Sequence, residues 1–113
     1  QKTGRLLREK LGWSDDKFRI TFQSRFGRAE WLQPYTEATV KDLAAQGKKR
    51  IAIICPGFSA DCLETLEEIA IGIKATFLES GGEAFHYIPC LNTDEDHVAL
   101  LTNLVKNEAQ GWI

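Results

Sequence analysis

The sequence has no methionine, only three prolines and three cysteines, and no long apolar run. A membrane-spanning helix needs about 20 apolar residues, and no signal peptide is readable, so we expect a cytoplasmic protein. Cys55, Cys62 and Cys90 are an odd number without a CxxC pair, which excludes a disulfide framework and fits a reducing compartment. The formal net charge is only −2, so nucleic acid has no basic surface to bind.

The chain is long enough for one domain and no more. Its 113 residues, 43% of them hydrophobic, can build a single core without metal or disulfide support. Leu6, Leu7 and Leu11 have helical spacing and Gly12 follows them, so residues 1–11 are predicted to be the end of a helix. Because the chain starts inside a helix and without methionine, either the initiator residue was lost or residues 1–113 are a piece of a longer protein.

Three segments have the patterns of strands. Residues 18–22 alternate apolar and polar side chains, as a half-buried strand does. Residues 51–55 form a continuous apolar run rich in β-branched side chains, which predicts a strand buried on both faces. Residues 84–88 read as a third strand and are followed by Pro89.

Helices are predicted between and after these strands. The first begins at Pro34 and is closed by Gly47, and the second runs from Ser59 to about Glu79. A last helix is predicted to start with Asn92 as its cap, and its buried stripe is expected to contain Val98, Leu101, Leu104 and Val105. The order predicts a doubly wound, Rossmann-like parallel α/β sheet flanked by helices.

Ligands of such sheets bind at the carboxyl ends of the strands, which points to the loops 24–33, 56–61 and 89–93. The 56–59 turn matches no phosphate-binding fingerprint. The segment that follows is acidic. At about 100° per residue, Asp61, Glu64 and Glu68 share one helix face, and the apolar side chains opposite them are Cys62, Leu63, Leu66, Ile69, Ala70, Ile73 and Phe77.

This acidic face has two interpretations. In the first, the acids at the helix start cap its free amides and interact favourably with the positive end of its dipole, and Glu68 is simply solvated. Alternatively, the row is a path for a divalent cation or a proton, because carboxylate oxygens hold Fe²⁺ weakly enough to release it. In that case clustered like charges are expected to raise at least one carboxyl pKa.

Other candidates lie on the neighbouring loops. Trp31 and Phe58 are large aromatic residues that could wall a flat hydrophobic ligand or pack in the core. Arg25 and Arg28 could pair with ligand carboxylates or remain solvated. The remaining polar candidates, which we expect to be structural, are His86, His97 and Cys62.

Four segments of the sequence resemble the C-terminal domain of bacterial members of the ferrochelatase family. These are QSRFG (23–27), WLQPYT (31–36), YIPCLN (87–92) and, most specifically, PGFSADCLETLEEI (56–69). The resemblance covers residues 17–112. It implies a chelatase-type α/β fold, one of two similar domains. It also implies insertion of Fe²⁺ into protoporphyrin IX, the last step of protoheme synthesis, in a cleft between those domains.

The resemblance also implies roles for individual residues. Glu64 matches the family's active-site glutamate, assigned to metal binding or proton abstraction. Asp61 and Glu68 match acids along the same path, on a helix that is locally widened to π form. Trp31 and Phe58 match residues near the porphyrin. Cys62 stands where some members have histidine.

By the same resemblance, Fe²⁺ is a substrate and no cofactor is expected. The family's histidine belongs to a segment before Gln1, and neither His86 nor His97 matches it. We therefore expect these residues to fold but to need the N-terminal domain of the same protein for activity. An iron–sulfur cluster is not expected from this part, and peripheral membrane association stays open.

Two alternatives remain at this point. One is a chelatase for another metal or tetrapyrrole, because carboxylates do not choose among first-row ions. The other is a non-enzymatic α/β module that binds an anion or a partner at residues 56–61.

Overall fold

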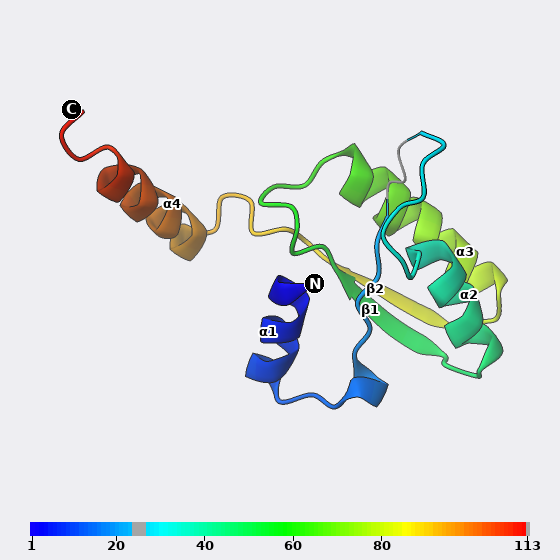
Figure 1. The fold of residues 1–113 in the computed structure, drawn as a ribbon. Coiled ribbons are helices and arrows are strands. Elements are labelled where there is room, and N and C mark those ends of the chain that lie inside the picture. The colour runs from blue at the N-terminus through cyan, green and yellow to red at the C-terminus, as the bar shows by residue number, and fades with distance from the viewer. Residues whose placement is uncertain (24–26, 113) are drawn as a thin grey trace.

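The computed structural model describes residues 1–23 and 27–112. Its sheet has two parallel strands, β1 (Arg50–Ile54) and β2 (Ala84–Ile88), with Arg50 opposite Ala84 and Ile54 opposite Ile88. Parallel neighbours need a crossover connection, and here it is helical (Figure 1). The predicted parallel α/β architecture is confirmed.

The crossover consists of η2 (Glu64–Ile73) followed directly by α3 (Lys74–Glu79), and α2 (Thr36–Ala45) precedes β1. Helices α2 and α3 lie side by side against the sheet (Figure 1). The core under them contains the buried residues Val40, Ala44 and Phe77, with Ile51, Ile53, Ile73 and Phe85 packed against it.

Among the described residues, helices cover only one face of the sheet, so the prediction that residues 51–55 are buried on both faces is wrong. Exposure alternates along both strands. Ile51 and Ile53 point toward the helices, whereas Ile54 is 41% exposed and Ile88 is 37% exposed on the other face. The reason is that α2 and α3 pack on the same side.

The third strand predicted over residues 18–22 does not form. Phe22 makes only an isolated parallel bridge to Tyr35, with Phe22 N donating to the Pro34 oxygen at 2.9 Å. The apolar alternation has another cause, because Ile20 packs against Gly4 of α1 (Lys2–Leu11). A Cβ on Gly4 would lie 2.9 Å from Ile20 Cδ1.

The predicted helix at the start of the chain is confirmed as α1. It ends at Gly12, whose φ of 67° is the left-handed conformation that glycine adopts without strain. The amides of Gly12 and Trp13 donate to the last carbonyls of α1, at Glu9 and Arg8. A short 3₁₀ turn, η1 (Asp15–Lys17), follows.

Three predicted helix starts shift by two or more residues. Helix α2 begins at Thr36 rather than at Pro34. The helix predicted from Ser59 begins as η2 at Glu64, because Ser59 and Asp61 are hydrogen-bonded to Asn92 in the loop after β2. Helix α4 (Glu95–Glu108) is capped by Asp94, whose Oδ1 accepts a hydrogen bond from Asp96 N at 3.0 Å, and not by Asn92. Asn92 has a φ of 49° and uses its side chain elsewhere.

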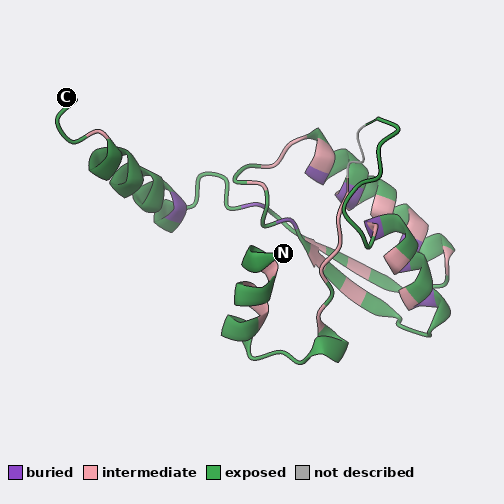
Figure 2. Cartoon of the chain, in the orientation of Figure 1, coloured by how far each residue is buried: buried purple, intermediate pink, exposed green. Residues whose placement is uncertain are grey.

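The apolar stripe of α4 is not buried as predicted. Helix α4 projects away from the sheet, and the exposed colour covers it beyond its first turn (Figures 1 and 2). Among the described residues only its start is anchored, through His97, and the stripe residues are 44–62% exposed: Val98, Leu101, Leu104 and Val105. The pattern was amphipathic, but no described element packs against it.

Candidate functional site

The acidic segment opens a π-helix. Helix η2 keeps this form for ten residues, Glu64–Ile73, although most π-helices are single turns, which frequently lie at functional sites. The widened helix implied by the resemblance is confirmed. Its side chains next to the sheet recur every four residues, as Thr65, Ile69, Ile73 and then Phe77 of α3.

The wider turn explains this spacing. On an α-helix, a side chain four residues along points about 40° beyond a full turn. On a π-helix with about 4.4 residues per turn, it points about 30° short of a full turn. The row therefore stays nearly straight across η2 and α3. Thr65 and Phe77 are 0% exposed and Ile69 is 1% exposed.

The same geometry overturns two predicted core positions. Leu63 and Leu66 were placed on the apolar side by assuming 100° per residue, but they are 70% and 48% exposed. Thr65 takes the buried position instead, next to Ile69. The signal that could have revealed this is the spacing of four between Thr65, Ile69, Ile73 and Phe77.

Asp61 lies before the helix and not on its face. Its Oδ1 accepts hydrogen bonds from Tyr87 OH at 2.5 Å and from Thr65 Oγ1 at 2.9 Å. Its Oδ2 accepts from Asn92 Nδ2 at 2.8 Å, and its own backbone N donates to Asn92 Oδ1 at 2.8 Å. Sequence reasoning missed Tyr87 and Asn92, because one was read only as a strand residue and the other as a helix cap.

These donors control the charge of the acids. The hydrogen bond from Tyr87, followed by that from Asn92, holds the pKa of Asp61 far below its ordinary value. A hydrogen bond from Cys62 lowers the pKa of Glu64. For both acids the shift is opposite to the predicted rise, because hydrogen-bond donors outweigh desolvation by burial. Both carboxylates are therefore ionised at neutral pH.

Glu64 is the first residue of η2 and is half-buried, whereas Glu68 is exposed. With about 4.4 residues per turn, the two side chains stay on one side of the helix. The Glu64 carbonyl oxygen accepts a hydrogen bond from Gln23 Nε2 at 2.8 Å. Within the described ranges 1–23 and 27–112, no three His, Cys, Asp or Glu side chains gather closely enough to hold a metal ion.

The two aromatic candidates differ in their surroundings. Phe58 is half-buried and packs against the core residues Cys55, Ile69 and Cys90. Trp31 is 41% exposed. Burial raises the pKa of Cys55 to about 11, so this thiol is protonated at neutral pH.

The remaining candidates are also located. Arg28 is exposed, and Arg25 lies outside the described residues. His86 is exposed on β2, and Cys62 is half-buried. The prediction of a structural His97 agrees with its contacts. The ring is buried, its Nε2 lies 2.9 Å from Ser59 Oγ, and its Nδ1 lies 2.8 Å from the oxygen of Asn92.

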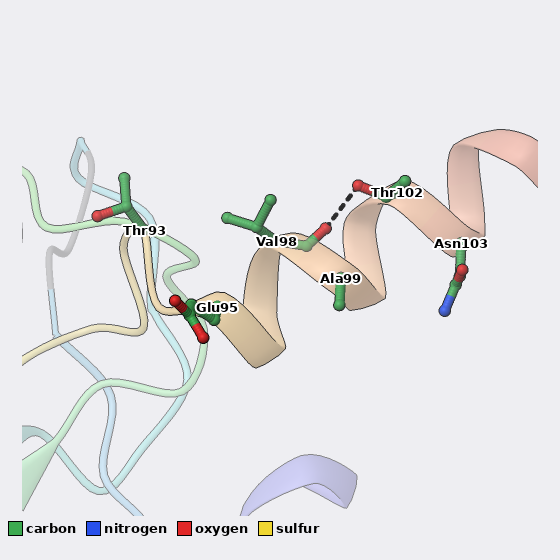
Figure 3. Close-up of a pocket in the computed structure, with 6 residues that line it drawn as sticks. All are labelled: Thr93, Glu95, Val98, Ala99, Thr102 and Asn103. Carbon is green, nitrogen blue, oxygen red and sulfur yellow. Dashed lines mark hydrogen bonds between the residues drawn. The ribbon is translucent and has the colours of Figure 1, made fainter.

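Two surface hollows lie away from Glu64. One follows α4 (Figure 3), where Thr102 Oγ1 donates to the Val98 oxygen at 2.8 Å; its lining residues are Thr93, Glu95, Val98, Ala99, Thr102 and Asn103. The other lies beside α1 and includes Arg5, Arg8 and Ile20. In the parts of the chain that the structure describes, every helix is too short or too polar to cross a lipid bilayer.

Known proteins share this sequence closely. A chain from Rhizobium meliloti (strain 1021) named ferrochelatase is 59% identical over all 113 residues. A ferrochelatase from Rhizobium leguminosarum bv. trifolii (strain WSM2304) is 61% identical over the same length, and "Ferrochelatase 1" from Shewanella oneidensis is 55% identical over 111 residues. The chain spans about a third (33%) of the length of these curated relatives.

The sequence profile of the ferrochelatase family matches residues 1–109, which include the acidic segment, both strands and η2. This chain therefore belongs to the ferrochelatase family.

Proposed function

We propose that the protein carrying this chain inserts Fe²⁺ into protoporphyrin IX to form protoheme. The observation that carries the proposal is Glu64, an ionised and half-buried carboxylate that opens a π-helix inside the segment matched to the ferrochelatase family. Because the chain spans a third of its relatives, we propose that it forms one wall of the site. The N-terminal domain supplies the other wall and the family histidine, so residues 1–113 alone are inactive.

The reaction explains why carboxylates are needed. Fe²⁺ must lose its water, and it replaces two pyrrole N–H protons, which leave the macrocycle. An ionised Glu64 can attract the cation and accept a proton as charge develops on the ring nitrogen. Oxygen ligands release Fe²⁺ more readily than a Cys and His cage would, and release is required because Fe²⁺ is a substrate and not a resident cofactor.

The neighbouring residues complete this wall. Glu68 lies one π turn beyond Glu64 and extends the negative charge outward, while Asp61 adds charge and keeps the first turn in place through its hydrogen bonds. We propose that these three acids line the route of the metal. Trp31 and the exposed part of Phe58 are proposed to lie on the porphyrin side, where aromatic rings can hold a bent macrocycle.

We further propose that the protein works in the cytoplasm, which its free Cys55, Cys62 and Cys90 support. Its partners in this proposal are protoporphyrin IX and Fe²⁺, not nucleic acid.

The test compares two variants of the full-length protein in an anaerobic insertion assay. Glu64→Gln should lower turnover by about 100-fold or more, the range for loss of a proton acceptor, with an unchanged melting temperature. Glu67→Gln is the matched control, because this exposed acid lies on the same helix but, at about 4.4 residues per turn, roughly 115° around the helix axis from Glu64. Its turnover should stay near that of the wild type. Near-normal turnover of Glu64→Gln with a lowered melting temperature would make Glu64 a capping residue and overturn the proposal.

Two further measurements on the full-length protein distinguish the proposed function from a chelatase for another metal and from a non-enzymatic module. Insertion of Co²⁺ in competition with Fe²⁺ would identify a chelatase for another metal. Porphyrin should quench Trp31 fluorescence, compared with a Trp31→Phe variant. Saturable binding of phosphate or flavin without porphyrin binding would instead support a non-enzymatic module.

A further inference from the structure

Tyr87 connects the end of the sheet to the start of the π-helix. It is half-buried on β2, and its hydroxyl donates to Asp61 Oδ1 at 2.5 Å. Asn92, in the loop after β2, holds the same residue at two points, through the Asp61 carboxylate and the Asp61 backbone N, both at 2.8 Å. Tyr87, near the end of β2, and Asn92, in the loop after it, thus hold Asp61 in place ahead of η2.

From Asp61 the hydrogen bonds continue into the first turn of η2. Thr65 Oγ1 donates to Asp61 Oδ1 at 2.9 Å and accepts from Cys62 N at 3.0 Å. The backbone N of Thr65 and that of Leu66 both donate to the Cys62 oxygen, at 3.2 and 2.9 Å. Asp61 and Thr65 thus lie on either side of Glu64 in the sequence and are joined by a hydrogen bond.

This turn needs such support. The first amides of a helix have no partner within it, and a π-helix is a rare form that local contacts must maintain. Hydrogen bonds to a charged carboxylate are stronger than those between neutral groups. Thr65 is 0% exposed, so its side chain is also held by packing.

We propose that Tyr87 and Asn92 are positioning residues for Glu64, acting through Asp61 on the first turn of η2. The catalytic consequence rests on the proposed function, whereas the structural consequence does not. A misplacement of about 1 Å in a reacting group can lower a rate by about 100-fold. The Tyr87 hydroxyl and the Asn92 amide are therefore needed for the rate of insertion without touching substrate.

The experiment uses the full-length protein and single variants of Tyr87, Asn92 and a control tyrosine, with an Asp61→Ala background as a further test. Tyr87→Phe removes one hydroxyl, and Tyr35→Phe is its matched control because Tyr35 is the other tyrosine of this chain and is also half-buried. Asn92→Gly removes the amide while glycine accepts the φ of 49° without strain. The readouts are kcat and KM for insertion, measured well below the melting temperature, and hydrogen exchange of the Thr65 and Leu66 amides.

Tyr87→Phe and Asn92→Gly should each lower kcat by about 10- to 100-fold with little change in KM for porphyrin. Each should also speed exchange of the Thr65 and Leu66 amides by about 10-fold, while amides paired between β1 and β2 keep their rates. Tyr35→Phe should change neither quantity. In an Asp61→Ala background, Tyr87→Phe should add no further effect on exchange, because its partner is gone.

Two results would overturn the positioning role. One is unchanged exchange at Thr65 and Leu66 in both variants. The other is a lowered melting temperature with unchanged kcat, which is what a purely structural hydrogen bond would give. If the wild-type protein inserts no metal, the proposed function fails, and the exchange data still decide whether Tyr87 and Asn92 hold the turn.

Discussion

The ring of Phe77 lies so close to Gly82 that a Cβ on Gly82 would stand 2.2 Å from Phe77 Cε1. Phe77 is 0% exposed, and the Gly82 amide donates to the Phe77 oxygen at 2.9 Å. The chain leaves α3 and enters β2 over this ring. Glycine is therefore required at position 82 for close approach and not for an unusual backbone angle.

Gly82→Ala should destabilise the protein by about 1–3 kcal/mol, the range for overpacking a core, because the ring cannot move away within a filled site. The measurement is the free energy of unfolding from denaturant titration of the full-length protein. Gly57→Ala is the control, since a Cβ there meets nothing within 4 Å. Equal stability of both variants would show that the Phe77 ring yields at no cost.

The row of buried side chains along η2 and α3 leads to a second prediction about stability. Ile69→Ala should cost about 2–5 kcal/mol, because it leaves a cavity at a position only 1% exposed. Leu63→Ala should cost far less, because Leu63 is 70% exposed. If this segment were an ordinary α-helix in solution, with about 100° per residue, Leu63 would be buried and its loss would be costly too.

Much of this fold could be predicted from local patterns. The apolar patterns of residues 51–55 and 84–88 predicted both strands, and Gly12 and Gly47 marked helix ends by a general conformational preference of glycine. The strand predicted over residues 18–22 was wrong. Alternation of apolar and polar residues shows only which side chains are covered, and here α1 covers Ile20 without any strand pairing.

The candidate site was predictable in composition but not in geometry. The acids were visible in the sequence, yet the π-helix changes the angle per residue and moves Thr65 into the core and Leu66 out of it. The contacts of Asp61 with Tyr87 and Asn92 join residues 26 and 31 positions apart. Such contacts depend on how β2 and its loop lie beside η2, which no local pattern encodes.

Asp61 should make stability fall in acid. Its pKa is lower in the folded chain than in the unfolded one, mainly through Tyr87 and Asn92. The stabilisation is therefore fully present above the unfolded pKa of about 3.9, and it is lost as the pH falls from there toward the depressed folded pKa. The measurement is the difference in unfolding free energy between the wild type and Asp61→Asn, which should shrink below about pH 4.

The variant comparison is needed because the pKa of Asp16 is also lowered, by a hydrogen bond from Ser14. Asp16→Asn is thus the control for general acid sensitivity. A wild-type advantage over Asp61→Asn that stays constant from about pH 7 to pH 3 would mean that Asp61 keeps no ionised, hydrogen-bonded form in the folded protein.

Glu68→Gln should weaken the use of iron without stopping the chemistry. Glu68 is exposed on the Glu64 side of η2, so under the proposed function its charge attracts the cation before transfer. We expect KM for Fe²⁺ to rise by about 3- to 10-fold at low ionic strength, with kcat nearly unchanged, and the difference to shrink in salt because exposed charges are screened. Glu83→Gln is the control, because Glu83 lies in the turn before β2 and pairs with Lys49 at 3.6 Å. A loss of kcat like that of Glu64→Gln would instead put Glu68 in the reaction itself, and an unchanged KM would remove it from the route of the metal.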